Sequence, residues 1–139
     1  MNSAQTAPAA VTRAPVDQVR GVEALYATAH WLLSEERPAD ASCVLRAMAL
    51  VAPTDERSWL ALGACHEALG QPEVALQMYG TGRVLAHPSV RCDLARARVL
   101  RREGRDHEAD LAVESATEAA EAANDGALLE LVLTERKRR

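Results

Sequence analysis

Histidine is the first side chain to consider for metal binding or acid–base chemistry, and this sequence has four: His30, His66, His87 and His107. They form no HExxH motif, and no two of them stand at the spacing of paired metal ligands. His66 lies within a well-patterned helical stretch, where we expect it to be a packed or capping residue. The histidines therefore predict neither a metal site nor an acid–base pair.

The cysteines could supply thiolate ligands, disulfides or a nucleophile. Cys43, Cys65 and Cys92 are odd in number, far apart and without a CxxC pair, so neither a disulfide framework nor a zinc site is encoded. Cys65 has no basic neighbour at helical reach that would lower its pKa, and we expect a buried, inert thiol. A reducing cytosol is the expected compartment.

Glycine loops that hold phosphates or expose a nucleophile are also missing from the sequence. It contains no GxxxxGK[ST], no GxGxxG after a strand and no GxSxG. The nearest approach, Gly80-Thr81-Gly82, falls inside a helical pattern, where close packing accounts for Gly82. We therefore predict no catalytic residues, no metal and no cofactor, and we do not expect an enzyme.

Composition points to a helical protein. The chain has 139 residues, 48% of them hydrophobic, with 3% aromatic residues and no Phe, so small and aliphatic side chains must form the core. The net charge of −4 argues against nucleic acid as a partner, and the closing run 136–139 is read as a solvated basic tail. No signal peptide and no stretch of ~18 apolar residues is present, so we expect neither export nor membrane insertion.

Residues of matching size recur at a spacing of 34, which is taken below as the repeat length. The sets that coincide are Ala29, Gly63 and Ala97; Ala41, Ala75 and Ala109; Leu45, Tyr79 and Val113; and Gly70 and Gly104. Small residues let two helices approach closely, and a larger residue fills the adjoining gap. The spacing therefore indicates a repeating pair of helices.

The clearest unit is the stretch WLALGACHEALGQPEVALQMY. Trp59, Leu62 and Gly63 form a W-x2-L-G pattern, with Ala75 and Tyr79 following at the distances found in tetratricopeptide repeats, which this stretch resembles. Gly70 suits a left-handed helix cap and Pro72 a first helical turn. The fold class that follows is all-α: tetratricopeptide helix-turn-helix repeats forming a short right-handed superhelix.

We expect three repeats, at 22–55, 56–89 and 90–123, within a domain over 19–123. Pro53 and Pro88 end the second helices of the first two repeats. Two departures stand out: Glu36-Arg37 replaces the glycine between the helices of repeat one, and repeat three has Asp93 and Arg96 where Trp and Leu are expected. Residues 1–18 are expected to be disordered, and residues 124–139 to form a capping helix and the basic tail.

The first helices of the repeats line the concave side of such a superhelix, where peptides bind. The register predicts that these residues line it: Tyr26, His30, Leu33, Leu60, Ala64, Glu67, Ala68, Leu94, Arg98, Arg101 and Arg102. One end of this groove is small and apolar and the other is cationic, which suits a peptide with apolar anchors and acidic residues. The alternative is that the arginines are only solvated.

Beyond the repeat, LGAC-x-x-ALGQ and the residues around it resemble the class II chaperones of bacterial type III secretion, the SycD/LcrH-like family, over residues 22–123. The resemblance implies a bacterial cytosolic chaperone, often a homodimer. It would hold the N-terminal segment of hydrophobic translocator proteins in its groove before export. Another tetratricopeptide adaptor remains an alternative, including the co-chaperone of the needle subunit, which binds a helical client.

Overall fold

The structure is a computed structural model, and it describes residues 16–87 and 89–138. The described residues form helices and turns with no strand. The helices are α1 (Val16–Ser34), α2 (Pro38–Val51), α3 (Glu56–Ala68), α4 (Pro72–Leu85), α5 (Val90–Arg102), α6 (Asp106–Ala123) and α7 (Gly126–Lys137). The all-α fold class is confirmed.

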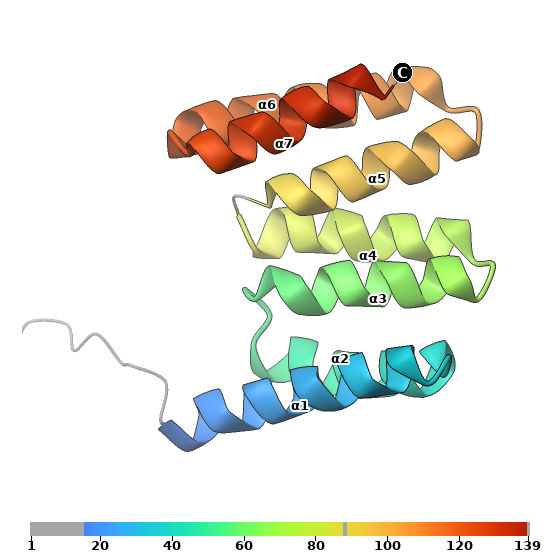
Figure 1. Ribbon diagram of the computed structural model, residues 1–139, viewed down its shortest axis with the longest axis vertical. Helices are drawn as coiled ribbons and strands as arrows, with labels where there is room; N and C mark the ends of the chain where they lie inside the picture. Colours follow the sequence, from blue (N-terminus) through green and yellow to red (C-terminus); the bar gives the residue numbers. More distant parts are fainter. Residues whose placement is uncertain (1–15, 88, 139) are drawn as a thin grey trace, which may run out of the picture.

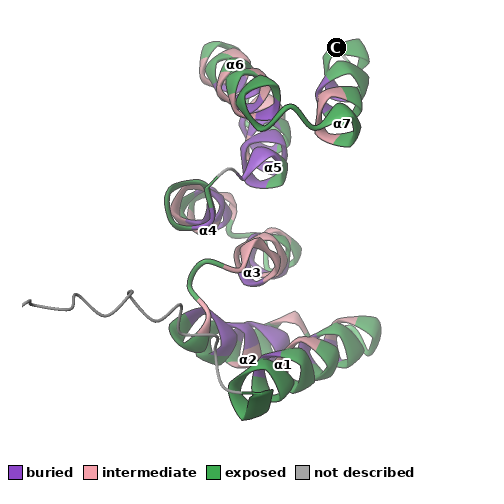
Figure 2. Ribbon diagram, turned by 90° about the vertical axis from the view of Figure 1, so that its left-hand side faces the viewer, coloured by how far each residue is buried: buried purple, intermediate pink, exposed green. Residues whose placement is uncertain are grey.

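The helices form a stack in which each packs against the next along the sequence (Figure 1). In addition α3 contacts α5, and α5 contacts α7. Figure 2 shows the consequence: α4 and α6 lie on one side of the stack, and α3 and α7 on the other. The odd-numbered helices thus share a face that the even-numbered helices do not reach.

The three turns that join the helices within a pair share one backbone conformation. Glu36, Gly70 and Gly104 have φ of 57°, 69° and 74°, and each stands one repeat length from the next. In each turn the amide of the following residue donates to a carbonyl in the last turn of the first helix, at 2.8–2.9 Å. This closes the end of that helix, as in a Schellman cap. The expected cap at Gly70 is confirmed, and Glu36 adopts the same conformation without being glycine.

The core matches the small and large residues of the repeat. A Cβ placed on Gly63 would lie 2.1 Å from Cε1 of the buried Tyr79, so this large ring requires glycine opposite it. The same positions hold the buried Ala29 and Leu45 in α1–α2. Gly82 also packs closely, because an added Cβ would lie 2.6 Å from Cβ of Trp59. The packing role expected for Gly82 is confirmed.

The two ends of the chain differ in part from expectation. The first helix begins at Val16, so residues 16–18, expected in a disordered segment, form its first turn. Residues 1–15, Pro88 and Arg139 lie outside the described part of the chain. At the other end α7 is capped by Asp125, whose carboxylate accepts from the backbone amide of Ala127 at 2.9 Å. Val132 of α7 is buried, but Leu131 and Leu133 of the same helix stay exposed, so only some of the apolar residues of α7 cover the core.

Candidate peptide-binding face

The candidate groove residues lie on α1, α3 and α5, the three helices that share one face (Figure 2). On α1, Tyr26 and Leu33 are half-buried and His30 is exposed, with the rings of Tyr26 and His30 6.5 Å apart. On α3, Leu60 is half-buried and Ala64 is exposed. These residues combine a solvent-exposed small side chain with partly covered apolar ones, which is the arrangement that an extended peptide with apolar side chains requires.

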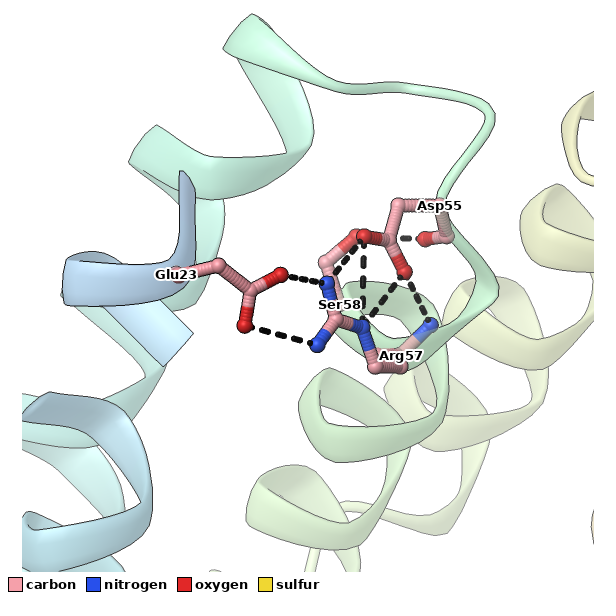
Figure 3. A network of polar contacts seen from close by, with 4 residues as sticks. All are labelled: Glu23, Asp55, Arg57 and Ser58. Carbon is pink, nitrogen blue, oxygen red and sulfur yellow. Dashed lines mark hydrogen bonds and ion pairs between the residues drawn. The ribbon is translucent and has the colours of Figure 1, made fainter. Parts of the chain in front are cut away.

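Arg57 joins α1 to α3 through a network of charged hydrogen bonds (Figure 3). Its guanidinium donates to both carboxylate oxygens of Glu23, at 3.2 and 2.6 Å, and to both of Asp55, at 2.8–3.3 Å. Asp55 also caps α3 by accepting from the Arg57 backbone amide at 3.1 Å. The hydrogen bond from Arg57 holds the pKa of Asp55 below its usual range, and that of Glu23 as well.

The same guanidinium fixes the orientation of Tyr26. The central carbon of Arg57 lies 4.6 Å from the centroid of the Tyr26 ring, in cation–π geometry. Because two carboxylates hold the guanidinium from its edges, its flat face is left to lie against the ring. The apolar end of the candidate groove therefore presents an aromatic side chain that is positioned before any ligand arrives.

Glu67 is the polar residue in the middle of this face. Its carboxylate accepts a hydrogen bond from the hydroxyl of the buried Tyr79 at 2.5 Å and forms an ion pair with Arg102. Burial, followed by this carboxylate, raises the pKa of Tyr79, which stays protonated and donates. The carboxylate of Glu67 is consequently engaged by side chains of the protein, and it connects α3 to both α4 and α5. Ala68, one residue on, is exposed.

The α5 end of the face differs from the sequence-based expectation. Leu94 is only 5% exposed and belongs to the core, so it offers no surface to a ligand. Arg98 and Arg101 lie 3.6 Å from the buried carboxylate of Glu135 on α7. Arg101 also lies 3.7 Å from Asp110. The cationic end expected from the sequence is thus partly paired within the protein, because α7 brings a carboxylate to these arginines.

The packing roles predicted for His66 and Cys65 are confirmed. His66 is 5% exposed, and its Nδ1 lies 2.7 Å from the side-chain oxygen of Gln71, which is the packed role expected. Cys65 is buried, and burial raises the pKa of its thiol. Burial likewise raises the pKa of Cys92 to about 11. Low-pKa thiolates are the reactive form of cysteine, so these two side chains have a structural role.

Two residues that shape this face were missed from the sequence, Arg57 and Glu135. The signal for Arg57 was present, because Glu23 precedes it by one repeat length and so stands at the same position of the neighbouring helix. Glu135 directly precedes the basic run 136–139, which was read as a tail, and its pairing depends on how α7 folds back onto α5. Among the described helices, none is both long and apolar enough to cross a membrane.

Comparisons with known proteins place this fold among secretion chaperones. No protein-family model and no curated protein sequence matches the chain. Solved structures do match. The type III secretion translocator chaperone SycD of Yersinia enterocolitica is 26% identical, with a TM-score of 0.75, over 91% of this chain and 97% of that one. SycD in complex with a peptide of the translocator YopD is also 26% identical, with a TM-score of 0.66, over 84% and 95%.

A second protein matches as well. PcrH, known from Pseudomonas aeruginosa, was solved in complex with the chaperone-binding region of PopB. That structure is 26% identical to this chain, with a TM-score of 0.70, over 89% of this chain and 99% of that one. Over most of its length the chain is thus similar to type III secretion translocator chaperones, and the family resemblance seen in the sequence is confirmed.

Proposed function

We propose that this protein is a cytoplasmic bacterial chaperone of type III secretion that binds hydrophobic translocator proteins before their export. The observation that carries the proposal is the similarity, over 84–91% of the chain, to SycD and PcrH, which include complexes with peptides of YopD, PopB and PopD. Segments of a translocator that insert into membranes would self-associate in water, and a chaperone that covers them keeps the client soluble.

The client segment binds in an extended conformation on the face formed by α1, α3 and α5. The residues proposed to contact it are Tyr26, His30, Leu33, Leu60, Ala64 and Ala68, with Glu67 fixed at the centre and Arg98 and Arg101 at the far edge. Apolar side chains of the client pack beside the oriented Tyr26 ring and over Ala64. Binding and release of the client make and break no covalent bond, and the protein is accordingly not an enzyme.

The scaffold of this face is proposed to be three copies of the helix-turn-helix repeat in a short right-handed superhelix. The supporting observation is that Glu36, Gly70 and Gly104 adopt one conformation at intervals of one repeat length. The expected repeat limits, 22–55, 56–89 and 90–123, each contain one turn of this kind. α1 begins before the first limit, and α7 follows the last one as the capping helix.

Two substitutions on the proposed face test the assignment. Leu60→Glu and Ala64→Glu place a carboxylate where apolar side chains of the client would bury it without a partner. We expect each to weaken binding of a translocator co-expressed with the protein by tenfold or more, about 1.4 kcal/mol. Leu50→Glu and Ala47→Glu are matched controls on exposed positions of α2 and should bind as the unchanged protein does. Normal binding by both α3 variants would show that the client lies elsewhere.

The identity of the client separates this proposal from the alternative. A translocator chaperone is expected to be soluble by itself, as a monomer or a homodimer, and to protect an N-terminal translocator peptide from proteolysis. A co-chaperone of the needle subunit would instead be recovered with that subunit and a second small protein, and its client would be helical. Co-purification followed by mass spectrometry distinguishes the two.

A further inference from the structure

A second groove lies between α4 and α6, with residues of α5 as its floor. Figure 2 shows α4 and α6 on the side of the stack opposite to α3 and α7. It consists of three hollows of about 540, 260 and 280 Å³. Arg83 lines all three, Arg96 lines two and Ser115 lines two, so the hollows adjoin one another. None of these residues belongs to the face proposed for the translocator.

The groove exists because the third helix pair departs from the pattern of the second. Asp93 and Arg96 stand one repeat length after Trp59 and Leu62. In the second pair Leu62 is 1% exposed and Trp59 packs against Gly82, so apolar side chains fill the space between the helices. The third pair has two charged side chains at these positions, and the space beside them is lined with polar groups.

Asp93 is the buried anchor of this groove. It is 2% exposed, its Oδ2 accepts from the hydroxyl of Ser115 at 3.0 Å, and its Oδ1 lies 3.3 Å from Nε of Arg83 without receiving a hydrogen bond. A buried carboxylate with an open acceptor is costly, and it attracts the nearest cation. Asp93 therefore holds Arg83 through its Nε, which leaves the two terminal nitrogens for another partner.

Two guanidiniums in this groove have N–H donors that no other side chain accepts from. Among the described residues, Asp93 is the one ion-pair partner of Arg83, and Arg96 has no hydrogen bond or ion pair with any side chain. The nearby Arg105 differs, because its guanidinium donates hydrogen bonds to the carboxylates of Glu108 and Glu73 at 2.7–2.9 Å. Glu108 is thereby engaged as well, and it does not neutralise Arg96 by direct contact.

Exposed apolar side chains line two of the three hollows. Val84 on α4 is 72% exposed and Leu111 on α6 is 51% exposed, and each lines one of the hollows. Their exposure is unfavourable in water and would be relieved by an apolar partner. Rim carboxylates such as Glu118 would repel the repeated charges of a phosphate backbone along the groove, whereas a single carboxylate placed at Arg83 and Arg96 lies among cations.

We propose that this groove binds an acidic, partly apolar peptide segment of a partner protein, with a carboxylate of the partner between Arg83 and Arg96 and its apolar side chains on Val84 and Leu111. Charge complementarity selects the occupant, because Arg83 and Arg96 have donors that no carboxylate of the groove engages by direct contact, apart from the pairing of Arg83 with Asp93. Guanidinium and carboxylate form paired, charge-assisted hydrogen bonds, which single out a carboxylate among polar partners. The proposal does not depend on the translocator face, which is formed by α1, α3 and other residues of α5.

A synthetic helical peptide of about 12 residues, with Glu and Leu on one face, is the probe, and its Glu→Gln counterpart is the matched peptide. It is titrated into the full-length protein while backbone amide NMR shifts are followed. We expect saturable shifts at Gly80, Leu111 and Ser115 and binding at least tenfold weaker for the Gln peptide. Arg83→Gln and Arg96→Gln should each weaken binding of the Glu peptide about tenfold. Arg46→Gln, on the exposed part of α2, should not change it.

The proposal is overturned by equal binding of the two peptides, by shifts at Leu60 and Ala64 in place of the groove, or by no shifts at about 1 mM peptide, where a contact of this kind should be detectable. If one arginine variant fails to fold, the other variant and the Gln peptide still decide the question. A translocator that binds the opposite face normally would leave this result unaffected.

Discussion

The contact between Gly63 and Tyr79 gives the most quantitative prediction. In Gly63→Ala the new Cβ would lie 2.1 Å from Cε1 of Tyr79, so the ring must move by roughly 1.5 Å to restore an ordinary carbon–carbon contact. Overpacking of this kind costs ~1–3 kcal/mol, and loss of the Tyr79 hydroxyl bond to Glu67 adds ~1.5–3 kcal/mol. Alanine returns about 1 kcal/mol of helix propensity. The net expectation is a loss of about 1.5–5 kcal/mol.

A double-mutant cycle isolates the cause. The equivalent positions hold Ala29 with Leu45 in the first helix pair, so Tyr79→Leu should make room for an alanine at position 63. In the Tyr79→Leu background, Gly63→Ala should cost little, which gives a coupling energy of about 2 kcal/mol. Urea unfolding followed by far-UV circular dichroism measures all four proteins.

Gly21→Ala serves as the control, because this helical glycine has nothing within 4 Å of an added Cβ. It should gain about 1 kcal/mol from helix propensity alone. The packing argument is refuted if Gly63→Ala is as stable as the unchanged protein, or if its cost is the same whether residue 79 is tyrosine or leucine.

Three further predictions concern single side chains. Glu36→Gly should raise the free energy of unfolding by about 0.5–1 kcal/mol in urea unfolding, since glycine adopts positive φ without strain, whereas Gly70→Ala should lower it by about 1 kcal/mol. Glu135→Ala should leave Arg98 and Arg101 without their buried partner and speed amide hydrogen exchange in α7 at least about tenfold, while exchange in α3 stays unchanged. Burial raises the pKa of Asp93, so the folded protein keeps this proton to higher pH than the unfolded chain does. The stability from this group is complete below the unfolded pKa and is lost as the pH rises through the folded one. Relative to the parent, Asp93→Asn should therefore gain stability between about pH 4 and neutral pH, and a difference that stays constant across this range would contradict the assignment.

The repeat could be predicted because its signals are local. Gly70 and Pro72 indicate where one helix ends and the next begins, and the spacing of Gly63 and Tyr79 predicts a contact within one helix pair. The same logic failed at Glu36, where the tertiary packing of α1 on α2 imposes a glycine-like conformation on a charged residue. Sequence patterns reflect the backbone conformation that a residue prefers, and tertiary packing can impose a different one.

The candidate face was predicted less well than the fold. Tyr26 and Ala64 follow from the register alone, because helix periodicity determines which side of α1 and α3 they occupy. Leu94 and the arginines of α5 do not, since their surroundings depend on α7. An ion pair such as Arg98 with Glu135 joins residues far apart in sequence, and no local pattern specifies it. The resemblance to type III secretion chaperones, which the solved structures support, came from the LGAC-x-x-ALGQ stretch.

The central claim is that the face of α1, α3 and α5 holds the client, and site-specific photo-cross-linking tests it most directly. A photoreactive amino acid replaces Ala64 on this face or, as the control, the exposed Ala47 on α2, and the protein is co-expressed with a candidate translocator. The account predicts a cross-link from position 64 to an N-terminal segment of the translocator, identified by mass spectrometry, and none from position 47. A cross-link from position 47 alone, or a needle-type subunit with a second small protein in place of a translocator, would contradict it.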